Sequence, residues 1–263
     1  MKIAILTVDE VFYLPIEVAY LMRHRHEDDE YRVFIVPPEH YDQLKKKREK
    51  VALRVLRSFG LMYFMRLAVR GLAFKVLRYL PRDERSDRFY SIDSVGSAFG
   101  VPVRHIANVN SERTIQMLSE WGVDLILSLS CPQVFRQGII DVSPNGVLNL
   151  HCSPLPRYRG LYPAFWQLKN GENEAGATIF FVNEKIDGGD ILIQRRFPIE
   201  TDETLDQFVK RSKRIGTELI VEGIEKIRCG DVDTSPIDID AGSYFTWPTR
   251  EAVREFQKSR RLI

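Results

Sequence analysis

The sequence has few cysteines, no long apolar run and little net charge. The first two absences each exclude a class of protein. Its three cysteines, Cys131, Cys152 and Cys229, lack the spacing of a metal site or a disulfide framework, which favours a reducing compartment. The longest uncharged run in the hydrophobic region 51–80 is Ser58–Met65, too short to span a bilayer. Met1–Leu6 leads into a strand without signal-peptide architecture. We therefore expect a cytoplasmic protein.

Glycine is missing from the turn after the first expected strand, Lys2–Val8. This turn, Thr7–Glu10, instead carries two adjacent acids, Asp9 and Glu10. A phosphate cradle needs close backbone approach and positive character. The turn offers neither, so we expect no nucleotide-phosphate site there.

The order of apolar segments predicts an α/β fold with a doubly wound, mostly parallel sheet. The first strand, a helix beginning near Ile16–Arg23 and a second strand at Tyr31–Val36 form a strand–helix–strand unit. Leu125–Leu129 is apolar almost throughout, as a strand covered on both faces requires. Further strands are expected at Val103–Ile106, 146–151, Thr178–Val182 and Ile191–Phe197, and further helices at Ser91–Phe99, Glu112–Trp121, Ala164–Lys169 and Thr204–Arg228. We expect a main domain over 1–200 and a C-terminal helix with a short strand extension, 201–263, packed on it.

Acids are nearly absent from residues 45–78. Glu49 is the only one, against eleven bases: Lys45, Lys46, Lys47, Arg48, Lys50, Arg54, Arg57, Arg66, Arg70, Lys75 and Arg78. The segment predicts a basic helical insertion, about 45–80, with one apolar face formed by Leu61, Met65, Ala68, Val69, Leu72, Val76 and Tyr79. Two interpretations stay open. The face packs on its own sheet or a second subunit, or the helix lies on an anionic membrane.

The residues with the clearest chemical meaning lie where another expected strand ends. Asn149 and His151 are two apart on an alternating segment, so their side chains share one face. Pro154, Pro156 and Gly160 follow, and they end the strand in an ordered loop. An amide beside an imidazole suits a site where a carbonyl oxygen gains negative charge.

This segment resembles the active-site signature of the 10-formyltetrahydrofolate-dependent formyltransferases. That family shares an Asn-x-His strand, a Ser/Pro/Leu-rich loop ending near Arg-Gly, and a later Asp-x-Gly element. Here Asn149, His151 and Asp187 occupy those positions, and the similarity is good from about Val103 to Pro198. The resemblance implies a Rossmann-like enzyme that transfers a formyl group from 10-formyltetrahydrofolate to a primary amine, without a metal.

The resemblance also implies where the ligands bind. The folate is expected between two loops, against Leu129, Ser130, Cys131, Pro132, Val134 and Phe135 in one and Val182, Gly188, Gly189 and Asp190 in the other. The acceptor is expected against Ser153, Arg159, Gly160 and Tyr162. Four aromatic residues near the motif are either acceptor contacts or core: Tyr158, Tyr162, Phe165 and Trp166.

Two features of the sequence bear on which amine accepts the formyl group. The acidic turn Thr7–Glu10 departs from the glycine-rich first loop of the glycinamide ribonucleotide enzymes. Only 63 residues follow Glu200, whereas methionyl-tRNA formyltransferases carry a further β-barrel domain. We therefore expect a nucleotide-linked amino sugar, nucleic acid being disfavoured, in an enzyme of cell-envelope synthesis at or near the inner face of the membrane. The alternatives are a methionyl-tRNA activity, with 45–78 as the RNA-binding surface, and a catalytically silent folate-binding or membrane-associated scaffold.

Overall fold

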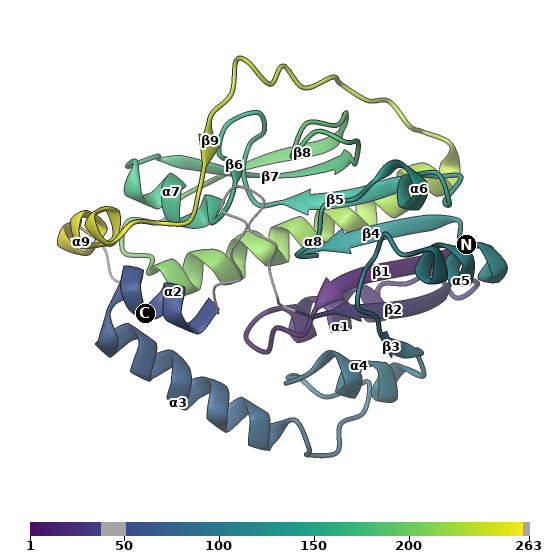
Figure 1. Cartoon of the computed structure of the whole chain (residues 1–263), viewed down its shortest axis with the longest axis horizontal. Helices are drawn as coiled ribbons and strands as arrows, with labels where there is room; N and C mark the ends of the chain where they lie inside the picture. The colour runs from purple at the N-terminus through teal and green to yellow at the C-terminus, as the bar shows by residue number, and fades with distance from the viewer. Residues whose placement is uncertain (38–50, 260–263) are drawn as a thin grey trace. The chain divides into compact units, whose positions relative to one another are not determined.

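The computed structural model describes residues 1–37 and 51–259 and confirms the α/β class (Figure 1). Seven strands form one sheet in the order β3-β2-β1-β4-β5-β7-β8. The pairs β3–β2, β2–β1, β1–β4 and β4–β5 are parallel, and β7–β8 is antiparallel. The strands are β1 (Lys2–Val8), β2 (Glu30–Val36), β3 (Val103–His105), β4 (Leu125–Leu129), β5 (Val147–His151), β7 (Glu174–Phe181) and β8 (Ile191–Pro198).

Two compact units divide the chain. The first comprises 1–49, 67–149 and 182–184, and the second comprises 50–66, 150–181 and 185–263. The boundary falls inside β5 and inside one helix, not at residue 200. The catalytic domain over 1–200 and the extension over 201–263 stay predictions.

The first unit is built on the parallel strands. Its core joins side chains of β1, β2 and β4, such as Leu6, Phe34 and Ile126, with Trp121 of α5 (Glu112–Trp121). The other helices of the unit are α1 (Leu14–Arg23), α4 (Ile92–Phe99) and the short α6 (Gln137–Ile140). Ser91 and Ser111 cap the N-termini of α4 and α5 with their hydroxyls, and left-handed Gly100 and Gly122 end them.

The second unit is built on the β7–β8 hairpin, against which α8 (Leu205–Cys229) packs. Thr204 and Gln207 form a reciprocal capping box at the start of α8. Helix α7 (Pro163–Lys169) contacts α8 and α9 (Arg250–Ser259). The chain also forms a two-stranded parallel sheet between β6 (Arg159–Gly160) and β9 (Tyr244–Phe245). The tail strand was expected and α9 was not.

The basic segment is helical from residue 51 onward. Helices α2 (Val51–Phe59) and α3 (Leu61–Leu77) are separated by Gly60, whose φ of 85° interrupts the helix. Five of the bases counted above, Lys45, Lys46, Lys47, Arg48 and Lys50, lie outside the described residues. The expected face of α3 does not pack on the sheet of its own chain, because no residue of the helix is buried and that face is exposed. Its packing on a second subunit or on a membrane stays a prediction. No helix among the described residues is long and apolar enough to cross a membrane.

Candidate active site

Strand β5 presents Asn149 and His151 at its carboxyl end. His151 is buried, with 7% of its surface exposed, and Asn149 is half-buried. The Asn149 amide forms no hydrogen bond with the described residues. The strand ends immediately afterwards, because Ser153 N–H turns back to the His151 carbonyl at 2.9 Å. Asn149 is the last residue of the first unit on this strand and His151 lies in the second, so each is described within its own unit.

The backbone of the loop sets the tautomer of His151. Its Nε2 lies 2.8 Å from the carbonyl oxygen of Tyr158. A carbonyl can only accept, so Nε2 carries a hydrogen and donates it. The other nitrogen, Nδ1, lies 3.9 Å from Oδ1 of Asp187. Nδ1 is therefore the nitrogen that gains or loses a proton, and it does so opposite a carboxylate.

Asp187 is held in place by its second oxygen. Its Oδ2 accepts a hydrogen bond of 2.8 Å from the backbone N–H of Gly160. This bond anchors the carboxylate to the Arg-Gly end of the loop 152–160, named the catalytic loop after the predicted catalytic residue His151 that precedes it. Asp187 itself has the left-handed conformation, with φ of 47°. The next residue, Gly188, leaves no room for a side chain, because a Cβ there would lie 2.7 Å from Cδ1 of Ile239.

Tyr158 is the residue that holds the catalytic loop, and sequence reasoning missed this role. Its backbone is left-handed, with φ of 62°, and its N–H donates to Ser243 Oγ at 2.9 Å. Its ring stacks on Phe245 with centroids 5.2 Å apart. Its hydroxyl donates to Glu172 at 2.6 Å and accepts from the Asn170 amide at 3.2 Å. These contacts fix the carbonyl that accepts the hydrogen bond from His151 Nε2.

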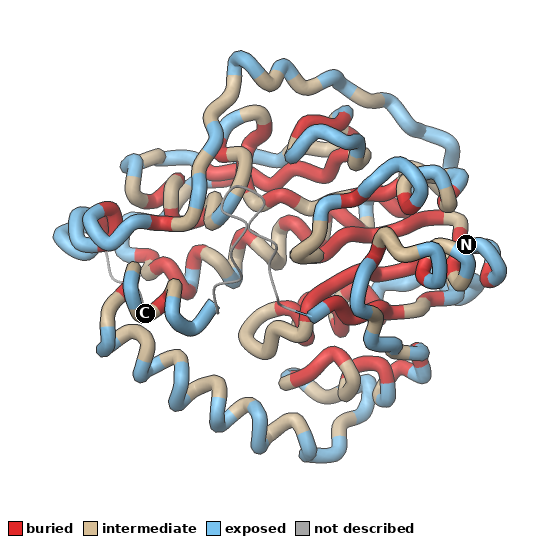
Figure 2. Tube along the Cα trace, in the orientation of Figure 1, coloured by how far each residue is buried: buried red, intermediate tan, exposed pale blue. Residues whose placement is uncertain are grey.

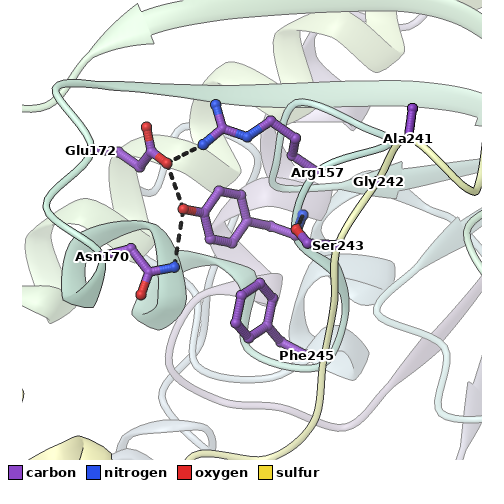
Figure 3. A pocket seen from close by; sticks show the side chains of 8 residues that line it. Arg157, Asn170, Glu172, Ala241, Gly242, Ser243 and Phe245 are labelled. Carbon is purple, nitrogen blue, oxygen red and sulfur yellow. Dashed lines mark hydrogen bonds and ion pairs between the residues drawn. The ribbon is translucent and has the colours of Figure 1, made fainter.

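Glu172 lies in the segment that follows α7 and completes the set of residues that hold Tyr158. It accepts hydrogen bonds from the Tyr158 hydroxyl and from Arg157, and Figure 3 shows Glu172, Asn170 and Arg157 around the same ring. Desolvation and the hydrogen bond to Glu172 raise the pKa of Tyr158 above its ordinary value. The hydroxyl therefore stays protonated and remains a donor near neutral pH.

A cavity of about 380 Å³ lies around this ring (Figure 3). It is lined by Arg157, Tyr158, Asn170, Glu172, Ala241, Gly242, Ser243 and Phe245. None of the predicted catalytic residues lines it. The cavity therefore lies next to the catalytic loop, and Tyr158 belongs to both.

The residues predicted to bind the acceptor differ in how far they are buried and in which groups they already bind. Ser153 is fully buried and its hydroxyl donates to the carbonyls of Arg157 and Tyr158, at 2.9 and 3.3 Å. Its hydroxyl thus shapes the loop, and its contact with the acceptor stays a prediction. The half-buried Arg159 guanidinium donates to the Ile186 and Ile239 carbonyls. Gly160 holds Asp187, as described above.

The aromatic residues near the motif mostly serve the core. Phe165 is fully buried, and Trp166 stacks on Phe245 while its Nε1 donates to the Thr246 carbonyl. Tyr162 is half-buried, left-handed with φ of 58°, and packs edge-on against Trp247. Tyr162 and Trp166 are therefore the two of the four aromatic residues that are partly exposed.

The residues predicted to bind folate fall in both compact units, and each group is described within its own unit. In the first, Leu129 and Phe135 are buried, Cys131, Pro132 and Val182 are half-buried, and Ser130 and Val134 are exposed. In the second, Gly188 and Gly189 are buried and Asp190 is exposed. Their contact with folate stays a prediction.

Cys131 does not have the properties of a nucleophile. Desolvation by burial raises the pKa of its thiol from 9.0 to about 11. The thiolate is thus scarce near neutral pH, as expected for a small core-facing residue. Among the described residues, no group of three His, Cys, Asp or Glu side chains is arranged to hold a metal ion.

Comparison with known proteins identifies the family. A family model described as formyl transferase matches residues 1–224. The chain belongs to the formyl transferase family. Methionyl-tRNA formyltransferase of Kosmotoga olearia is 31% identical over 174 residues, which are 65% of this chain and 56% of that protein. The chain spans about half the length of the curated relatives it matches.

Solved structures show that the fold of this formyl transferase is shared widely. WlaRD, a sugar 3N-formyl transferase, is 17% identical with a TM-score of 0.58, over 94% of this chain and 69% of WlaRD. Glycinamide ribonucleotide transformylase 1 of Symbiobacterium toebii is 18% identical with the same TM-score, over 90% of this chain and 94% of that protein. At these identities the similarity establishes the fold alone.

Proposed function

We propose that this formyl transferase moves a formyl group from 10-formyltetrahydrofolate to a primary amine. The observation that carries the proposal is the His151–Asp187 pair at 3.9 Å, fixed on one side by the Tyr158 carbonyl and on the other by the Gly160 N–H. Structures of family members hold folate compounds, such as the 5-N-formyl-THF present with WlaRD.

The three residues have distinct tasks in this reaction. The amine nitrogen attacks the formyl carbon, and the carbonyl π bond becomes an oxyanion that the Asn149 amide and a protonated His151 can stabilise. The nitrogen then loses a proton, and the folate N10 takes one as its bond to the formyl carbon breaks. Nδ1 of His151 is the nitrogen placed to exchange such a proton, and Asp187 stabilises the imidazolium.

A nucleotide-linked amino sugar is the acceptor that we favour. WlaRD, which shares this fold, is a sugar 3N-formyl transferase. The ribonucleotide acceptor of the glycinamide enzymes fits less well. The backbone N–H groups of Phe12 and Tyr13, just before α1, and of Leu14, its first residue, donate to the Glu10 carboxylate at 2.5, 2.9 and 3.0 Å. A carboxylate thus occupies the helix N-terminus that could otherwise receive a phosphate.

Methionyl-tRNA is the second candidate acceptor, because the curated relatives with about 30% identity are methionyl-tRNA formyltransferases. A competition experiment separates the two. Purified protein with 10-formyltetrahydrofolate is offered nucleotide-linked 3-amino and 4-amino sugars, methionyl-tRNA or glycinamide ribonucleotide, and the formyl group is detected by mass spectrometry. We expect formylation of an amino sugar. Transfer to methionyl-tRNA alone would show that the acceptor is the tRNA and not an amino sugar. If none of these amines is formylated, the proposal that the protein is a formyl-transferring enzyme is contradicted.

A folate-binding scaffold without activity is tested separately. Calorimetry with 5-formyltetrahydrofolate, an unreactive analogue, should show saturable binding by the wild type and by His151→Ala. Binding without turnover of any amine would support the scaffold. Absence of binding at millimolar ligand would contradict both functions.

A further inference from the structure

The exposed side of α3 is an apolar stripe bordered by bases. Its large side chains, Leu61, Met62, Met65, Val69, Leu72 and Val76, range from 49% exposed at Met65 to 72% at Met62. At 100° per residue they fall within one arc of about 100° on the helix. Figure 2 shows α3 without a buried position along its length.

The opposite side of α3 is already occupied by the protein. In the first unit, Phe74 packs on Phe12 and Tyr90, with centroids 5.7 and 4.9 Å apart. Arg70 lies over the Phe12 ring at 4.9 Å, and Arg78 pairs with Asp9 and Asp93 at 3.7 and 3.2 Å. The apolar stripe therefore faces away from the surface that α3 already covers.

The charges at the edges of the apolar stripe determine which kind of surface can cover it. Arg66 and Lys75 project from its two edges, are exposed, and form no ion pair with the described residues. Residues 51–82 contain no Asp or Glu. A second copy docked face to face would bring bases against bases whichever way the helices crossed, with no acid from this segment to pair them. An anionic surface that accepts apolar side chains has the complementary chemistry.

We propose that α3 binds the surface of an anionic lipid bilayer. The stripe enters the boundary between headgroups and acyl chains, with the helix axis parallel to the membrane. Arg66 and Lys75 extend from the edges toward lipid phosphates while their methylene chains stay in the apolar layer. Phe74 and Arg70 contact other residues of the first unit, so they take no part in this arrangement. It does not depend on the proposed reaction.

Vesicle co-sedimentation of the full chain tests the proposal without an activity readout. The wild type should sediment at low salt with vesicles of phosphatidylcholine and phosphatidylglycerol, and stay in the supernatant with phosphatidylcholine alone. Raising the salt should release it. Val69→Ser/Leu72→Ser and Arg66→Glu/Lys75→Glu should each lower the partition coefficient at least about tenfold.

Arg113→Glu/Arg254→Glu is the charge-matched control. These two bases are exposed on α5 and α9, and the same change of charge there should leave binding within about threefold of the wild type. All variants are surface changes, and thermal unfolding verifies that they are folded. A wild type that stays in the supernatant with anionic vesicles overturns the proposal, as does unchanged binding of Val69→Ser/Leu72→Ser. Sedimentation velocity showing a dimer that this variant abolishes, without lipid binding, assigns the stripe to a second copy instead.

Discussion

Replacing Asp187 with Asn should remove the charge opposite His151 while keeping the loop intact. The Asn side-chain oxygen can still accept the Gly160 N–H that Oδ2 accepts at 2.8 Å. What is lost is the attraction between the carboxylate and a protonated imidazole 3.9 Å away. The two side chains are only 8% and 13% exposed, so solvent screens the pair weakly. At that separation and an effective dielectric of about 20, the attraction is about 4 kcal/mol.

A loss of about 4 kcal/mol in the transition state corresponds to a rate lower by about 10³-fold, and partial screening reduces this to about 10². We expect kcat to fall within that range and KM for the folate to change little, because Asp187 acts through the imidazole. Steady-state formylation of the amine found in the acceptor screen measures both constants. Asp202→Asn, the same substitution at an exposed loop position, should retain wild-type kcat. Asp187→Asn with kcat within about tenfold of the wild type would refute the reasoning.

Three further predictions concern Asn149 with His151, Tyr158, and Cys131. Asn149→Ala and His151→Ala should each lower kcat at least about a hundredfold without unfolding the protein, as circular dichroism and steady-state assays would show; near-normal turnover in both would contradict the assignment. Tyr158→Phe should lower the free energy of unfolding by about 1–2 kcal/mol in urea titrations and reduce kcat, because it removes the donor to Glu172; unchanged stability would contradict the role of that hydrogen bond. Burial holds the Cys131 thiol protonated, so its stabilising contribution is complete below pH 9.0 and is lost as pH rises through about 11. Across that range the wild type should lose about 2 kcal/mol more unfolding free energy than Cys131→Ala, and parallel pH profiles would contradict this.

Local signals allowed most elements to be predicted from the sequence. Ser91 with Gly100, and Ser111 with Gly122, marked both ends of α4 and α5 because caps act within a few residues. Helix α9 was missed since it shows only three buried positions, Ala252, Val253 and Phe256, among polar residues. Such a pattern does not separate a docked helix from a polar tail.

The sequence could not predict which side of α3 faces the protein. Periodicity places apolar residues on one stripe, but the partners of the opposite side, Phe12 and Tyr90, come from distant positions. The same limit applies at the site. Asn149, His151 and Asp187 are recognisable as a motif, whereas the support of Tyr158 by Glu172 and Ser243 depends on contacts that no spacing reveals.

The pairing of β9 with β6 ties the catalytic loop to residues far along the chain. Ser243 accepts the Tyr158 N–H, and the Phe245 carbonyl accepts the N–H of Leu161, next to Gly160. These tail residues follow the end of the family match at residue 224. During synthesis, the ribosome makes the loop about 85 residues before the strand that braces it. A nascent chain that already displays the whole Asn-x-His motif and Asp187 still lacks this brace, so the shape of the site is completed only as the last part of the described chain emerges.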